Sequence, residues 1–302
     1  MYQTYGVIDP VSNTRLDVLG MDVGLTWFSM QEAAQLITLC GCNITDLKLS
    51  FKSSMGFSKN MLDAIGDLQS LKVLILLGSK IRRTRNNSKS IEALLTSTTK
   101  WESLSIHCVA LDSLDLWPGS SPNLSHLWLA TYPENQAALT RFCKDVAMDV
   151  KIFECLSPEN QEDIAPMIVS LRNSIEILFL ECIPDNLPGD LCAMYFLKLT
   201  VFQSIGSGII LSNLSWLQWP VFVLLEVFIT SCSHSKKDWL KMLTCPVWAG
   251  VILPKNFKWI IYTSWKGQSM CNDELVHAFL AYDIKCLFRP KLTHRDMLES
   301  LE

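Results

Sequence analysis

Few residues in this sequence have the types and spacings that chemistry requires. His107 is followed by Asp112 and Asp115, and a histidine near a carboxylate resembles an acid/base pair, but no activated nucleophile accompanies it. The run Cys232-Ser233-His234 is too short and isolated to fix zinc, and Cys40-Gly41-Cys42 has no partner pair. A lone histidine in a strand is more often a surface residue than a catalytic one. We therefore expect no catalytic residue and no metal site.

Larger enzyme signatures are missing as well. The sequence has no glycine-rich phosphate loop, no HExxH, no GxSxG and no paired CxxC. The net charge of -4 argues against general affinity for nucleic acid, which needs a strongly basic surface. We predict that the protein is not an enzyme, needs no cofactor and has no nucleic-acid partner.

The composition indicates a folded body in a reducing compartment. The chain has 302 residues, of which 49% are hydrophobic and 19% charged, so it can bury a large core. Its eleven cysteines are odd in number and follow no framework spacing, and residues 1–9 lack the pattern of a secretory signal. The least polar window, residues 208–229, is interrupted by polar residues and does not predict a membrane span. We expect a cytoplasmic or nuclear location.

One spacing organises the whole sequence. Leu71, Leu74 and Leu76 occupy the first, fourth and sixth places of an LxxLxL pattern, which is typical of the short strand in a leucine-rich repeat. The pattern recurs in steps of about 21 to 35 residues, which matches and slightly exceeds the usual repeat period. The other copies are Leu16/Leu19/Met21, Ile44/Leu47/Leu49, Trp101/Leu104/Ile106, Leu124/Leu127/Leu129, Ala147/Val150/Ile152, Ile175/Leu178/Leu180, Phe196/Leu199/Val201, Phe222/Leu225/Val227, Phe257/Ile260/Tyr262 and, weakly, Ala281/Ile284/Cys286.

Helical patterns alternate with these strands. Apolar residues grouped for one buried helix stripe predict helices near residues 29–39, 60–68, 91–95, 138–146, 164–171, 239–243 and 275–279. Strands that alternate with helices predict an α/β fold with right-handed crossovers. We therefore predict an irregular leucine-rich-repeat solenoid with a parallel sheet on the concave side and helices on the convex side. It would form a single domain over residues 1–302, with a weak N-terminal cap (1–40), repeats (41–290) and a C-terminal tail (291–302).

Two features depart from a regular repeat. Three places beyond the last leucine, where a regular repeat carries Asn or Cys, only Cys155 fits; the repeat around Leu129, for example, has Tyr132. An extra LxxLxL copy spans residues 111–116, only ten places after Trp101 and just before a Pro/Gly-rich turn. That step is too short for another helix, so we predict a loop or a short edge strand there.

Side chains alternate along a strand, so the third, fifth and seventh places of each copy should face away from the core. In the frames above, aromatic side chains recur at these places, with His126 and charged residues between them, as at protein interfaces. The predicted aromatic ridge consists of Trp128, Phe153, Phe179, Phe202, Phe228 and Trp259. The alternative is that both faces of the sheet are covered, or that some frames are misplaced. If the ridge exists, Phe202→Asp with Phe228→Asp should abolish partner capture without unfolding the protein.

The segments at residues 49–79, 101–106, 111–116 and 122–128 together resemble the fungal F-box/leucine-rich-repeat proteins that rust fungi carry in large numbers. The resemblance covers about residues 40–290 and implies the substrate-binding solenoid of a cullin-RING ubiquitin ligase. Its partners would then be a substrate protein on the concave face and the ligase adaptor. The F-box itself, with its Leu-Pro pair, is not recognisable near the start. A stand-alone interaction scaffold with no ligase role is therefore the alternative.

Overall fold

The structure of the protein is a computed structural model that describes most of the chain. The described residues are 18–23, 27–51, 57–78, 86–98, 100–108, 111–116, 121–156, 164–180, 189–204, 217–231, 240, 243–244, 253–264 and 272–290. They belong to two compact units, residues 1–174 (unit 1) and 175–302 (unit 2), and each unit is described by itself. The prediction of one domain over residues 1–302 stays a prediction.

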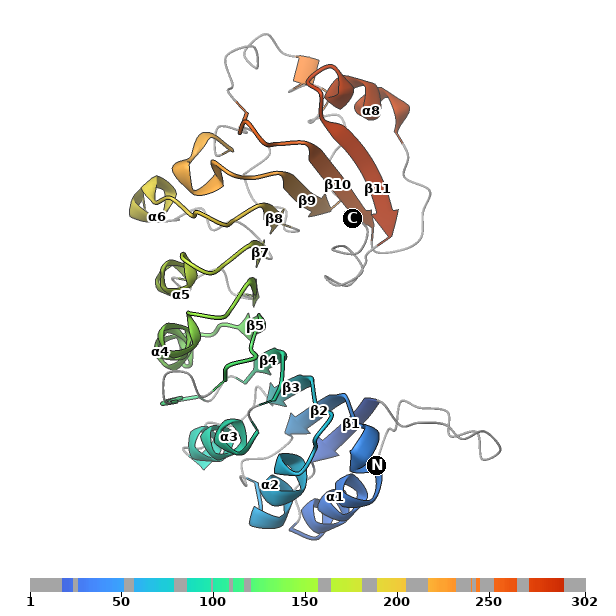
Figure 1. The fold of residues 1–302 in the computed structure, drawn as a ribbon, viewed down its shortest axis with the longest axis vertical. Helices are drawn as coiled ribbons and strands as arrows, with labels where there is room; N and C mark the ends of the chain where they lie inside the picture. Colours follow the sequence, from blue (N-terminus) through green and yellow to red (C-terminus); the bar gives the residue numbers. More distant parts are fainter. Residues whose placement is uncertain are drawn as a thin grey trace, which may run out of the picture. The chain divides into compact units, whose positions relative to one another are not determined.

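Unit 1 contains a parallel sheet of six described strands (Figure 1). The strands are β1 (Val18–Val23), β2 (Asp46–Phe51), β3 (Val73–Gly78), β4 (Ser103–His107), β5 (His126–Ala130) and β6 (Ile152–Leu156). Each strand pairs in parallel with the next one along the chain. The strand order in space therefore repeats the order in sequence, as stacked repeats require.

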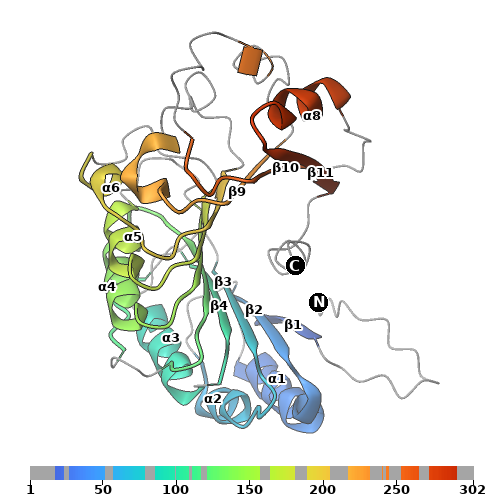
Figure 2. The same ribbon diagram turned by 45° about the horizontal axis from the view of Figure 1, so that its top comes forward.

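Helical elements follow most of these strands. They are α1 (Trp27–Cys40), the short η1 (Gly41–Asn43), α2 (Lys59–Gly66), α3 (Asn86–Ser97), α4 (Gln136–Val146) and α5 (Ala165–Leu171). Figure 2 shows α1 to α4 in chain order on the same side of the strands, which is the convex side of unit 1. Local capping supports this layer: the Ser58 side chain accepts a hydrogen bond from the Met61 N–H at the start of α2.

Leucine rows form the core between the two layers. Leu47, Leu74, Leu104 and Leu127 lie in register on β2 to β5, and each is 0% exposed. Each buried leucine side chain contributes about 1.5–3 kcal/mol relative to an exposed one. This row, repeated two residues later along each strand, is why the LxxLxL pattern specifies the stack. The prediction of an α/β leucine-rich-repeat-like solenoid is confirmed.

The link between β4 and β5 is the irregular part of unit 1. In residues 111–116 the chain forms neither helix nor strand, yet Leu111, Leu114 and Leu116 are buried. The Asp112 N–H donates to Ser88 Oγ on α3 (2.8 Å), and Asp115 pairs with Arg141 on α4 (2.8 Å). The extra LxxLxL copy is therefore a loop, as predicted, and it fills the layer between two helices.

A buried asparagine fastens the turns that follow β4 and β5. Asn135 is 0% exposed, and its Nδ2 donates to the carbonyls of Cys108 (2.7 Å) and Ala130 (3.1 Å). Its Oδ1 accepts from the Tyr132 N–H (2.9 Å). The preceding repeat also packs closely against Cys108, because a Cβ added at Gly78 would lie only 3.0 Å from the Cys108 Cα. Asn135 thus fills the bridging role that repeat proteins usually give to an earlier position.

Unit 2 repeats the strand arrangement of unit 1. Its strands are β7 (Ile177–Leu180), β8 (Val201–Ser204), β9 (Val227–Ser231), β10 (Trp259–Ser264) and β11 (Lys285–Pro290), and its described helices include α6 (Gly189–Ala193), η4 (Pro220–Phe222) and α8 (Asp273–Leu280). All strand pairings within this unit are parallel. Asn272 caps α8 by accepting from the Leu275 N–H (2.9 Å). Of the predicted helix near residues 239–243, the structure describes residues 240 and 243, which are helical, and the other three lie outside the described residues.

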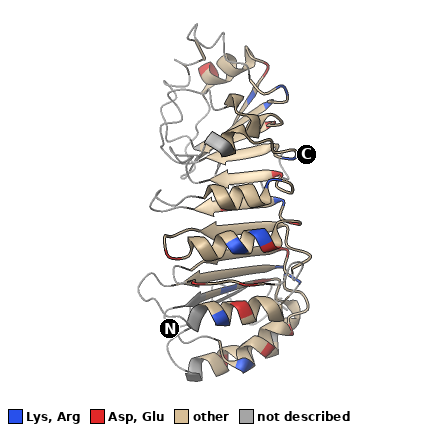
Figure 3. Ribbon diagram, turned by 90° about the vertical axis from the view of Figure 1, so that its left-hand side faces the viewer, with Lys and Arg blue, Asp and Glu red and all other residues tan. Residues whose placement is uncertain are grey.

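Charged residues of both signs are mixed over the helix layer. Figure 3 colours basic and acidic positions on the same helices, and on α4 the residues Arg141, Lys144 and Asp145 lie close together in sequence. None of the described helices has the length and apolar content that crossing a bilayer demands.

Candidate functional site

The sheet of unit 1 presents two different faces. Residues in register with Leu104 and Leu127 point into the helix-covered core, so the residues that alternate with them point to the opposite side. We call that side the open face. On β4, β5 and β6 it carries one row of Ser103, His126 and Ile152 and a second row of Ser105, Trp128 and Glu154.

The predicted aromatic ridge is wrong at three of its six residues. Phe153 lies in register with Leu127, Phe202 with Leu178, and Phe228 with Phe202. All three are core residues, with 0%, 0% and 1% of their surface exposed. In unit 2 this core packing is explicit, because the Phe202 ring lies 4.8 Å from that of Phe222 on η4 and 5.8 Å from that of Phe228.

The cause is a frame shift of three residues in each of these repeats. The true copies are Val150/Phe153/Cys155, Leu199/Phe202/Ser204 and Leu225/Phe228/Thr230. Their sixth place holds a small residue rather than a large aliphatic one. A pattern that requires a large residue at the sixth place selects a frame that begins three residues too early. Because side chains alternate along a strand, a shift by an odd number of residues assigns core residues to the outward face.

The other three ridge residues do lie on the face predicted for them. Phe179 alternates with the core residues of β7, but it is only 5% exposed. Trp259 is half-buried, and the ammonium of Lys285 lies 4.5 Å from the centre of its ring. Trp128 is half-buried on the open face of unit 1. The six residues therefore do not share one exposed face, and in unit 1 Trp128 is the predicted ridge residue that lies half-exposed on the open face.

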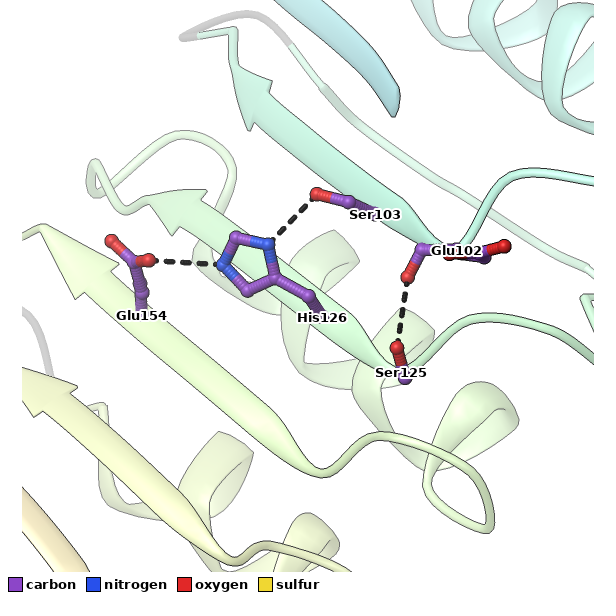
Figure 4. A network of polar contacts seen from close by, with 5 residues as sticks. All are labelled: Glu102, Ser103, Ser125, His126 and Glu154. Atoms are coloured by element: carbon purple, nitrogen blue, oxygen red, sulfur yellow. Dashed lines mark hydrogen bonds and ion pairs between the residues drawn. The ribbon is translucent and has the colours of Figure 1, made fainter. Parts of the chain in front are cut away.

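A hydrogen-bonded polar network crosses three strands of the open face (Figure 4), and its member Glu154 lies in register with Trp128. Ser103 Oγ is 2.8 Å from His126 Nδ1, and His126 Nε2 is 2.9 Å from Glu154 Oε1. The three residues come from three successive strands, β4, β5 and β6. The side chains of His126 and Glu154 are only 7% and 17% exposed, so the network is held in place by its surroundings.

A serine hydroxyl, an imidazole and a carboxylate in line resemble the proton relay of hydrolases. Such a relay also needs donors that stabilise an oxyanion. The backbone N–H of Ser103 is taken by the Lys72 carbonyl (3.0 Å) and that of His126 by the Glu102 carbonyl (3.0 Å). Neither is available to an oxyanion. The arrangement therefore fixes the His126 ring and the Glu154 carboxylate.

Two polar atoms beside this network are buried without a hydrogen-bond partner in the described structure: Ser105 Oγ and His107 Nε2. The His107 ring packs edge-on against the Trp128 ring, with centroids 4.4 Å apart and planes at 85°. Burial lowers the pKa of His107, although Glu154 opposes this shift and Lys48 adds to it. His107 is therefore neutral at pH 7, and it orients Trp128.

The alternative pairing of His107 with Asp112 or Asp115 is not formed. Asp115 pairs with Arg141, and the groups that influence the His107 charge are Glu154 and Lys48. Within the described residues, no cluster of three or more His, Cys, Asp or Glu side chains is arranged to hold a metal ion. Cys232-Ser233-His234 lies outside the described part of the chain.

The sequence interpretation missed Ser103 and Glu154 as members of a site. Their signal is a polar residue at an outward place in successive repeats, but Glu154 reaches such a place only when the β6 frame is correct. His126 was predicted to be outward-facing, and this placement is confirmed by its register with Ser103.

Together, the fold and the open face define an α/β solenoid of the leucine-rich-repeat type with a structured polar and aromatic patch. No known protein family matches the chain, and no curated protein matches it either. Among solved structures it is similar to a Bacteroides fragilis protein whose crystal structure comes from a structural genomics consortium. The two are 13% identical, with 89% of this chain and 73% of the other covered and a TM-score of 0.46. A likeness of this size carries no argument about function.

Proposed function

We propose that the protein is a non-enzymatic recognition module that binds a partner protein on the open face of unit 1. The observation that carries this proposal is Trp128, a large aromatic side chain left half-exposed between His107 and Glu154. Tryptophan is one of the residue types enriched among the few side chains that dominate the binding energy of protein interfaces. The fixed neighbours of Trp128 reduce the conformational entropy that binding would otherwise cost.

The fixed geometry of the Ser103–His126–Glu154 network supports recognition. Both ring nitrogens of His126 have partners, so the ring is held in one orientation. The backbone N–H groups of Ser103 and His126 donate to carbonyls of the preceding repeats. A network held in one shape presents a preorganised surface, and preorganisation favours binding.

Affinity purification from cell extract tests this proposal. Wild type, Trp128→Asp and a control, Leu39→Asp, would be compared by mass spectrometry of the captured proteins. Leu39 lies on α1 and is 82% exposed, so its variant places the same charge on the helix side. We expect Trp128→Asp to lose the partner by about tenfold or more, while the control retains it. Equal capture by the folded Trp128→Asp protein would refute the proposal.

The resemblance to F-box/leucine-rich-repeat proteins supports a narrower proposal, a substrate receptor of a cullin-RING ubiquitin ligase in the cytoplasm or nucleus. The alternative is a stand-alone scaffold with no ligase role. The same purification separates them. A ligase adaptor captured by both wild type and Trp128→Asp supports the receptor, whereas a partner without any adaptor supports the scaffold.

A further inference from the structure

We draw no further inference here: the strongest candidate, the half-buried aliphatic row Val73, Ile75 and Leu77 on the open face of β3, two strands from Trp128, is an apolar sheet face for which nothing in the structure shows what covers it.

Discussion

Replacing Asn135 should destabilise unit 1 more than any other polar change in its described part. Asn135→Ala removes three hydrogen bonds, to the Tyr132 N–H and to the carbonyls of Cys108 and Ala130. A net loss of about 1 kcal/mol per hydrogen bond, with a further cost for groups left buried and unpaired, gives a decrease of about 3–5 kcal/mol in the free energy of unfolding.

Asn135→Asp separates the donor role from the shape of the side chain. The carboxylate retains the acceptor for the Tyr132 N–H, but an acceptor oxygen replaces Nδ2 and faces the carbonyls of both Cys108 and Ala130. Its destabilisation should lessen as the pH falls toward the ordinary aspartate pKa of about 3.9, because a protonated carboxyl regains one donor. Asn135→Ala should show no such recovery.

The assay is hydrogen exchange in a urea series, followed by mass spectrometry of peptides from residues 101–146. Asn123→Ala is the matched control, since Asn123 is exposed and should change stability by no more than about 0.5 kcal/mol. A loss below about 1 kcal/mol for Asn135→Ala would refute the reasoning, because it would mean that the two carbonyls do not depend on this side chain.

Three further predictions concern single groups. Burial lowers the pKa of His107, so the His107 imidazole of the unfolded chain is protonated at a higher pH than that of the folded chain. The free energy of unfolding should therefore fall as the pH drops below about 6.5. Urea midpoints should show that it falls less steeply in His107→Gln. An equal pH dependence in both proteins would contradict this. Iodoacetamide at about pH 8 should modify exposed Cys42 in the native protein and spare Cys108, because burial raises the pKa of the Cys108 thiol to about 12. Peptide mass spectrometry measures the two rates, and modification of Cys108 as fast as Cys42 would contradict this prediction. Asp283 has φ of 61°, so Asp283→Gly should raise the stability of unit 2 by up to about 1 kcal/mol in thermal unfolding, and a loss would show that its side chain matters more than its backbone.

The sequence was sufficient for the strand and helix order because burial follows a simple spacing. Leu74 and Leu104 fall in register since each occupies the same place of its repeat. The loop over residues 111–116 was also predictable, because the interval leaves no room for a helix. These features depend on local pattern alone.

The bridging asparagine and the polar network could not be found in the same way. The repeat pattern expects the bridging residue at the position of Tyr132, but Asn135 lies three residues later. Its partner Cys108 belongs to another repeat. The Ser103–His126–Glu154 alignment requires the register of three strands, and the misplaced frame of β6 concealed Glu154. Both features depend on contacts between repeats, which no single repeat specifies.

Phe202 provides the test that separates the two interpretations of the chain. If Phe202 belonged to an exposed ridge, Phe202→Asp would remove partner capture and leave the fold intact. In the structure it is 0% exposed and packs on Phe222 and Phe228. The variant should therefore lose about 3–5 kcal/mol of packing, and the buried carboxylate adds its desolvation cost.

That loss is comparable with the total stability of a typical domain, about 5–15 kcal/mol, so unit 2 should unfold or become sensitive to protease. Tyr195→Asp is the control, because Tyr195 is in the same unit and is 62% exposed. Limited proteolysis and circular dichroism would compare the two variants with wild type. A Phe202→Asp protein that kept the wild-type unfolding temperature and lost its partner would restore the exposed ridge. Loss of unit 2 structure with the control unchanged would place Phe202 in the core and leave Trp128 as the residue through which to study recognition.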